Sequence, residues 1–188
     1  MAITTRYVTI EELLRELQSL VDQGFKTSEV HGYLLETLIE PESLETYLSF
    51  RPDRYARNLI YKSDAFELLA ICWEVGQKAP IHGHEGELCW SRVERGTLRF
   101  TNYREVSEKP LVLERLAEPL NGKQGHLDGP ADIHEVENLL SFGEKAVSLH
   151  LYSRPYSECD IYDLPQGKKE RVRLSYDTMF GRPVTLLP

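Results

Sequence analysis

The hydrophobic period of this chain changes near Leu59, and that change limits the folds it can adopt. Before it, apolar residues recur at helical spacing, as in "TIEELLRELQSLVDQG". After it, short runs alternate apolar and polar residues between Gly, Pro, Asn and Asp, as in "AFELLAICWEV", "ELCWSRVERGTLRFTNYRE", "KPLVLERL" and "AVSLHLYS". Strands so closely spaced predict an antiparallel sandwich or barrel and not a parallel α/β sheet.

Three short helices are predicted in the first part of the chain. Thr9 and Glu12 have the spacing of a capping box at the start of the first helix, and Gly24 is its expected end. Ser28 is expected to cap the second helix. Pro41 suits the first turn of the third, since that position needs no backbone donor.

The length of 188 residues suits one domain that buries a real core. We therefore predict a single domain over residues 1–188. Its helical cap is expected at about residues 8–50 and its β-barrel at about residues 59–180.

The charge and the cysteines indicate where the protein works. A net charge of −8 disfavours nucleic acid and anionic membranes as partners. No apolar run approaches the roughly 18 residues that span a bilayer, and "MAITTRYVTIEELLRELQSL" lacks the core of a signal peptide. Cys72, Cys89 and Cys159 are too few and too scattered for a disulfide framework. We expect a monomeric protein of the reducing cytoplasm.

The stretch "PIHGHEGELCW" carries two histidines, His82 and His84, that are one residue apart. In an extended segment both imidazoles project to the same side, and Gly83 between them lets the backbone bend around a small object. A metal site is one interpretation. A polar loop with two unrelated histidines is the other.

Two later runs add polar side chains of the same kind. "DIHEVEN" carries His134, and alternation in "AVSLHLYS" separates an aliphatic face from a polar one. The polar face carries Ser148, His150 and Tyr152. It is either a solvated surface or a hydrogen-bonded relay that lines a wet cavity.

The histidine spacing resembles the two motifs of the cupin barrel. The segment from His82 to Gly96 is similar to the first motif, with Cys89 in place of its usual glutamate. The segment from His134 to Asn138 is similar to the second. The resemblance implies a mainly β fold, a small jelly-roll-like cupin barrel behind a short N-terminal helical cap.

Within the cupins, the chain resembles the cysteine dioxygenases, a family of thiol dioxygenases. The matching stretches are "YARNLI", "LAICWEVGQKAPIHGHEGELCW", "IHEVEN" and "AVSLHLYSRPYSECDIYD". The most specific features are the cysteine at the glutamate position and the Ser-x-His-x-Tyr pattern. One departure is Gly83, where the animal enzymes carry an acidic residue. Because this position is not a ligand, we expect it to change local flexibility more than chemistry.

The resemblance implies an iron(II) ion held by His82, His84 and His134, which oxidises L-cysteine with dioxygen to cysteine sulfinic acid, a step of cysteine catabolism. Three neutral imidazoles leave the full charge of the metal in place. Such a centre favours an incoming thiolate and lowers the pKa of a bound thiol.

Cys89 has three possible roles. The resemblance implies a thioether bond to Tyr152 that fixes the phenol beside the metal. Alternatively, the thiol is itself a ligand in a His/His/Cys site for zinc or copper, or it is a buried free cysteine.

The remaining roles also follow from the resemblance. It implies that Arg57 binds the substrate carboxylate with help from Tyr55 and Tyr152, since a guanidinium fork matches a carboxylate. Without it, Arg57 would be one surface arginine among many. Ser148 and His150 are implied to orient the Tyr152 hydroxyl through a Ser–His–Tyr chain.

Four other residues are expected to be peripheral. Cys159 is placed near the pocket mouth, and Cys72 in the core. His31 and His126 are expected to be solvated or structural.

Two further functions stay open. One keeps the mechanism but takes 3-mercaptopropionate or cysteamine as the substrate. The other is a non-catalytic, metal-binding cupin that senses or stores a small ligand.

Overall fold

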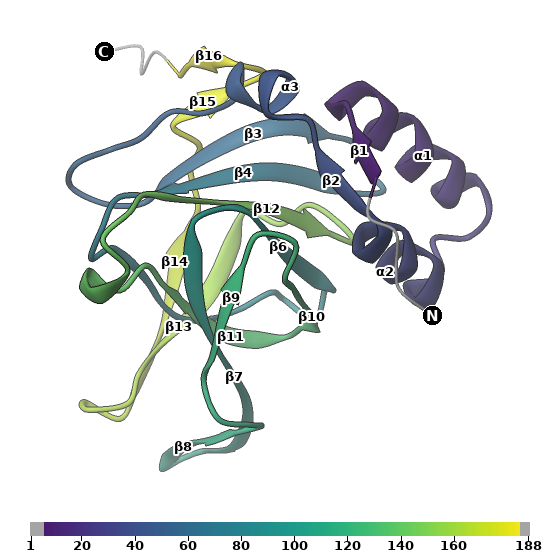
Figure 1. Ribbon diagram of the computed structural model, residues 1–188. Helices are drawn as coiled ribbons and strands as arrows, with labels where there is room; N and C mark the ends of the chain where they lie inside the picture. Colours follow the sequence, from purple (N-terminus) through teal and green to yellow (C-terminus); the bar gives the residue numbers. More distant parts are fainter. Residues whose placement is uncertain (1–5, 185–188) are drawn as a thin grey trace.

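The computed structural model describes residues 6–184 as two curled β-sheets with three helices packed on one side (Figure 1). The helices are α1 (Ile10–Asp22), α2 (Thr27–Glu36) and α3 (Pro41–Glu45), with a 3-10 turn η1 (Leu140–Phe142). The predicted fold class, a mainly β protein with a short N-terminal helical cap, is confirmed.

The first large sheet has the order β10-β6-β12-β4-β3-β15-β16. Its strands are β3 (Ala56–Lys62), β4 (Glu67–Trp73), β6 (Cys89–Arg95), β10 (Leu127–Ala131), β12 (Ala146–Tyr152), β15 (Thr178–Met179) and β16 (Arg182–Pro183). The inner strands are buried along their whole length because helices cover one side and the second sheet covers the other.

The second large sheet has the order β14-β13-β5-β11-β7-β8, and β9 also pairs with β7. Its strands are β5 (Lys78–Gly83), β7 (Thr97–Glu108), β8 (Leu111–Arg115), β9 (Leu120–Lys123), β11 (Ile133–Glu137), β13 (Glu158–Asp163) and β14 (Lys168–Arg173). A separate parallel pair is formed by β1 (Arg6–Val8) and β2 (Thr37–Ile39). All pairings inside the second sheet are antiparallel, as predicted.

The helix starts test the local predictions. Thr9 and Glu12 form the predicted capping box, Pro41 lies in the first turn of α3, and Gly24 follows the end of α1 with φ +93°. The prediction for Ser28 is wrong. Helix α2 begins at Thr27, so Ser28 lies in its first turn, and the cap residue Lys26 makes no side-chain hydrogen bond.

The aliphatic face of β12 holds the helices on the barrel. Its side chains share one core cluster with the leucine stripe of α1. The cluster includes Leu13, Leu17, Leu20, Val147, Leu149 and Leu151. Because this face turns outward to the helices, the alternate residues of β12 must turn into the barrel.

A buried ion pair also joins the barrel to the helical layer. Arg92 on β6 lies 2.6 Å from Glu94 and donates to the backbone oxygens of Leu34 and Thr37. Glu94 in turn accepts from the backbone N–H of Ile39. Both side chains are almost fully buried, and these contacts satisfy charges that would otherwise be costly there.

Candidate active site

Three imidazoles converge at the centre of the second sheet. His82 and His84 lie on and just after β5, and His134 lies on β11 directly opposite His82. Gly83 between the first two sends both rings to the same side. The three rings have centroids 4.7–5.1 Å apart, and one nitrogen from each lies within 4.8 Å of the others. That spacing is suited to three ligands of one ion.

Each ring uses its Nδ1 atom to bind an oxygen of the protein. The partners are Pro80 O at 2.8 Å from His82, Ala131 O at 3.1 Å from His84, and Asp128 Oδ2 at 3.5 Å from His134. The Nε2 atoms of His84 and His134 are buried and have no hydrogen-bond partner among the described residues. Buried nitrogens without a partner are costly, and a metal ion would satisfy both. The residues therefore fit a metal.

The electrostatic surroundings keep the rings of His82 and His84 neutral. Burial and the neighbouring His134 lower the pKa of His82 to about 3, and the same two causes lower the pKa of His84 well below its usual value. Neutral imidazoles are the form that binds a metal. Among the described residues, the cluster of potential ligands contains neither a carboxylate nor the thiol of Cys89.

The polar face of β12 is buried inside the barrel and is not a solvated surface. Ser148, His150 and Tyr152 are each at most 3% exposed. The register of β12 with β6 places Cys89 opposite Tyr152 and Ser91 opposite His150. These side chains therefore form one polar layer beside the three histidines.

His150 makes different contacts from those implied by the Ser–His–Tyr pattern. Its Nε2 atom lies 2.8 Å from Ser148 Oγ, and its Nδ1 atom lies 3.0 Å from Ser91 Oγ. Both ring nitrogens are thus engaged by serines. The Tyr152 ring lies 6.2 Å away between centroids, with no hydrogen bond to His150 among the described contacts. The chain implied from Ser148 to the Tyr152 hydroxyl is therefore not formed in this structure.

Cys89 and Tyr152 are neutral neighbours. Burial raises the pKa of the Cys89 thiol to about 12, against a smaller lowering by the hydrogen bond from Ser91. Burial, and then the proximity of Cys89, raise the pKa of the Tyr152 phenol. Both groups keep their protons at neutral pH.

A pocket of about 240 Å³ opens beside the histidines. Its lining includes Tyr55, Arg57, His82, Tyr156 and Cys159. Arg57 is 8% exposed, and its Nε atom has no partner among the described residues. A buried guanidinium with a free donor is suited to an anionic ligand. Cys159 lies in the pocket wall, close to the place expected for it.

Phenol groups surround the guanidinium of Arg57. Burial lowers the pKa of Arg57, but the electrostatic influence of Tyr152, Tyr156 and Tyr55 outweighs it and keeps the pKa raised. Tyr55 is held by stacking on Trp73, with centroids 4.9 Å apart. The structure therefore brings the three predicted substrate-binding residues together.

Three residues that contact the candidate site were not found from the sequence. Tyr156 packs against both Tyr152 and His84, at 5.0 and 6.2 Å between ring centroids. Asp128 binds His134, and Ser91 binds His150. Only Tyr156 carried a local signal, since it lies four positions after Tyr152 in a stretch already singled out.

Cys72, His31 and His126 do not line the pocket beside the histidines. Cys72 is in the core, and all three cysteines are free and buried. His31 lies on α2, and His126 lies in the turn between β9 and β10.

No helix in residues 6–184 is both long and apolar enough to cross a bilayer.

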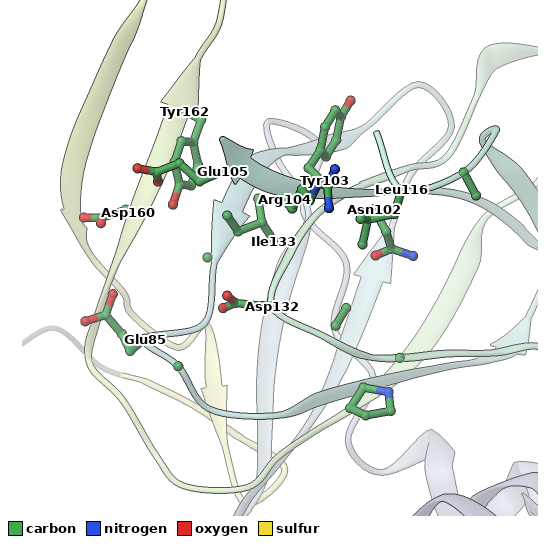
Figure 2. A pocket seen from close by; sticks show the side chains of 16 residues that line it. Glu85, Asn102, Tyr103, Arg104, Glu105, Leu116, Asp132, Ile133, Asp160 and Tyr162 are labelled. Carbon is green, nitrogen blue, oxygen red and sulfur yellow. The ribbon is translucent and has the colours of Figure 1, made fainter. Parts of the chain in front are cut away.

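A second pocket, of about 820 Å³, lies elsewhere on the barrel (Figure 2). None of the three histidines lines it. Its acidic side chains include Glu85, Glu105 and Asp160, and these already form ion pairs with Lys169 and Arg171. The pocket beside Arg57 is therefore the better candidate for the active site.

A small antiparallel barrel in which three histidines converge beside a buried arginine defines a metal-binding protein of the cupin class. Comparison with protein families narrows this class. The model of the family described as "Cysteine dioxygenase type I" matches residues 2–165. The chain belongs to the cysteine dioxygenase type I family. It is an enzyme and a thiol dioxygenase, which removes the non-catalytic cupin from consideration.

Curated relatives agree with this assignment. Cysteine dioxygenase type 1 of Homo sapiens is 29% identical over 177 residues, which are 92% of this chain and 88% of the relative. The protein of the same name from Rattus norvegicus is 30% identical over the same shares.

Solved structures of low similarity were also found. A protein with a double-stranded beta-helix domain from Klebsiella pneumoniae has a TM-score of 0.45 and 12% identity, covering 64% of this chain and 95% of its own. An RmlC-like cupin protein from Desulfovibrio desulfuricans has a TM-score of 0.39 and 17% identity, covering 58% and 91%.

Proposed function

We propose that this enzyme is an iron(II)-dependent dioxygenase that converts L-cysteine and dioxygen into cysteine sulfinic acid. The observation that carries the proposal is the pair of buried, unpartnered nitrogens of His84 and His134. They lie beside His82, which lines the pocket that also holds Arg57. Iron(II) held by these histidines would supply the redox chemistry that a thiolate needs to react with dioxygen.

Arg57 would bind the carboxylate of the substrate through two parallel hydrogen bonds. Tyr55 lines the same pocket, Tyr152 acts electrostatically on the guanidinium, and both would complete the cradle. The pocket volume of about 240 Å³ is below the roughly 300 Å³ of the smallest pockets for drug-sized ligands. It therefore suits a ligand of amino-acid size.

Tyr152 would act as a hydrogen-bond donor. Burial raises the pKa of its phenol, so the proton stays on the oxygen at neutral pH. The residue is 1% exposed, and the surrounding walls keep water from competing for this hydrogen bond. We assign to Tyr152, with Arg57, the orientation of the thiol toward the metal.

We further propose that Cys89 and Tyr152 become joined by a thioether bond. Their opposition across β6 and β12 supports this pairing. The absence of the Cys89 thiol from the cluster of potential ligands disfavours the alternative His/His/Cys site. A bond to Tyr152 would lock the phenol next to Arg57. Ser148 and His150 would then act on Cys89 through Ser91, since neither forms a hydrogen bond to the Tyr152 hydroxyl among the described contacts.

A second substrate class keeps the same mechanism. The carboxylate of 3-mercaptopropionate could also bind Arg57, whereas cysteamine has none. Relative kcat/KM values for L-cysteine, 3-mercaptopropionate and cysteamine separate these possibilities, since each analogue lacks one distinct contact. We expect L-cysteine to be preferred.

Incubation of the iron-loaded protein with L-cysteine in air tests the main proposal. Oxygen should be consumed in equal amount to the cysteine sulfinic acid formed. Oxygen uptake that yields only cystine, or no uptake with any of the three thiols, would contradict it.

The setting of the enzyme is part of the proposal. The free state of all three cysteines and the net charge of −8 support a single-domain monomer of the reducing cytoplasm that binds neither nucleic acid nor membranes. Light scattering on the purified protein measures its mass in solution and would reveal a dimer.

A further inference from the structure

A line of buried polar groups leads from the core of the first sheet to the thiol of Cys89. Trp73 Nε1 lies 3.0 Å from Ser148 Oγ, which lies 2.8 Å from His150 Nε2. His150 Nδ1 lies 3.0 Å from Ser91 Oγ, which lies 3.6 Å from Cys89 Sγ. None of these side chains is more than 3% exposed. The line crosses β4, β12 and β6 and ends beside Tyr152.

The donors and acceptors of this line favour one direction. An indole N–H can only donate, so Ser148 accepts from Trp73. A neutral imidazole donates from one nitrogen and accepts at the other. If Ser148 also accepted from His150, its own hydroxyl proton would have no acceptor among the described contacts. A buried hydroxyl without a partner is costly.

In the opposite direction every N–H and O–H of the line has an acceptor. Ser148 donates to His150 Nε2, His150 Nδ1 donates to Ser91, and Ser91 donates to the sulfur of Cys89. The one donor left over is the S–H of Cys89, and a thiol is a weak donor. The line therefore delivers a hydrogen bond to sulfur.

The strand register places this hydrogen bond next to the thioether partner. Ser91 and Cys89 are two residues apart on β6, so both side chains enter the barrel. Tyr152 lies opposite Cys89, and His150 lies opposite Ser91. The sulfur thus has the serine hydroxyl on its own strand and the phenol ring across from it.

We infer that Ser91 is a positioning residue for the bond between Cys89 and Tyr152. Its hydroxyl holds the sulfur beside the phenol ring and stabilises the negative charge that develops there as the thiol proton leaves. The inference rests on the proposed function, because this bond needs dioxygen and the metal.

The reaction balances with dioxygen as the oxidant. A carbon–sulfur bond forms while the S–H bond of Cys89 and one ring C–H bond of Tyr152 break. Two protons and two electrons leave and reduce one dioxygen to hydrogen peroxide. Ser91 takes part in no bond that is made or broken, so its effect is on the rate of bond formation.

The test compares Ser91→Ala with the full-length wild type. Both are prepared without iron and air, then mixed with iron(II), L-cysteine and air. Intact mass and denaturing gel mobility report the loss of two hydrogens over time. A hydrogen bond to developing charge corresponds to crosslinking about tenfold slower in Ser91→Ala. Crosslinking at the wild-type rate would overturn the inference.

Two matched variants separate the hydroxyl from its volume. Val93→Ala removes a larger buried side chain from the same face of the same strand and should crosslink at the wild-type rate. Ser91→Thr keeps the hydroxyl and should crosslink far faster than Ser91→Ala. Bound iron should be equal in all of them. If Val93→Ala is slowed as much as Ser91→Ala, packing and not the hydrogen bond is responsible, and the inference fails.

If Ser91→Ala does not fold, Ser148→Ala provides the test. It interrupts the same line at its other end and should slow crosslinking by a smaller factor. A wild-type rate in this variant would also overturn the inference.

Sulfinate formation is measured in the same samples. A wild type that makes sulfinate but never crosslinks would overturn this inference and leave the proposed function intact. A wild type that does neither would overturn both.

Discussion

Tyr152 lies directly opposite Cys89 in the ladder between β12 and β6. Opposed residues of an antiparallel pair have Cβ atoms about 4.5–5.5 Å apart. A cysteine sulfur can reach an aromatic ring across that gap. The two residues are 63 positions apart in the sequence and become neighbours only through the strand register.

The thioether bond should therefore form in the iron-loaded enzyme exposed to cysteine and air. Part of the wild type should lose the mass of two hydrogens, whereas Cys89→Ala and Tyr152→Phe should each give one unmodified species. Cys159→Ala is the control, because it removes another buried thiol of the pocket wall. Intact mass measurement decides, and crosslinking in Tyr152→Phe would show that the partner is a different residue.

His84→Ala should lose most of its bound iron. The variant removes a buried nitrogen that has no other partner and leaves only two of the three converging rings. His126→Ala should keep its iron, because His126 is not one of the three converging rings. Metal analysis after gel filtration measures both. Full iron content in His84→Ala would disprove the ligand set.

Asp128→Asn should weaken iron binding by about 10- to 100-fold, as replacement of a residue that orients a ligand generally does. Asp128 Oδ2 lies 3.5 Å from Nδ1 of His134 and fixes the orientation of that ring. Asp132→Asn is the control, since Asp132 lies nearby and is not among the hydrogen-bond partners of the three histidines in the described residues. Iron titration against a competing chelator gives the two affinities, and equal values would remove Asp128 from the site.

Arg57→Gln should lower kcat/KM for L-cysteine by about 10- to 100-fold, because hydrogen bonds to a charged group are lost. Oxidation of cysteamine, which has no carboxylate, should change much less. Arg173→Gln removes a more exposed arginine from the same pocket and serves as the control. Steady-state oxygen uptake by the wild type and the two variants gives kcat/KM for each thiol. An equal loss for both thiols would mean that Arg57 supports the fold and does not select the carboxylate.

The stability of the protein should fall above about pH 9, partly because of Cys72. Burial raises the pKa of this thiol from its ordinary value of 9.0 to about 12. Between these values the folded protein keeps the proton and the unfolded chain loses it. The free energy of unfolding therefore decreases as pH rises, by about 1.4 kcal/mol per pH unit for one such group.

In Cys72→Ala the free energy of unfolding should fall less steeply with pH, by about 1.4 kcal/mol per pH unit. Urea unfolding at several alkaline pH values measures both slopes, and the slopes are compared because the mutation also leaves a small cavity. Identical slopes would mean that Cys72 does not contribute.

Local features were the most predictable parts of this fold. The capping box of Thr9 and Glu12 depends on four consecutive residues, and Pro41 needs only its own ring, so both were found from the sequence. Ser28 failed although it is a good capping residue, because the helix starts at Thr27 without any side-chain cap.

Part of the site followed from short spacings. His82 and His84 share a strand face because they are two apart, and the polar face of β12 follows from the same alternation. Whether that face was solvated depended on the second sheet, which no local pattern reveals. Its burial therefore emerged only from the structure.

The contacts between strands could not be predicted. Ser91 meets His150 and Asp128 meets His134 through side chains that come from different elements. A shift of one residue in register would turn each strand's side chains to the other face. For this reason the Ser–His–Tyr pattern pointed to Tyr152 as the second partner of His150, whereas in the structure that partner is Ser91.

The attachment of the helices through Arg92 has a practical consequence for shortening the chain. A truncated chain that began at β3 would lack Leu34 and Thr37, and the guanidinium of Arg92 would lose both backbone acceptors. It would also open the aliphatic side of β12 to water, on the very strand that carries Tyr152. Truncation at the amino end should thus yield aggregates instead of a smaller working catalyst, and any minimal version of the enzyme has to retain its leading helices.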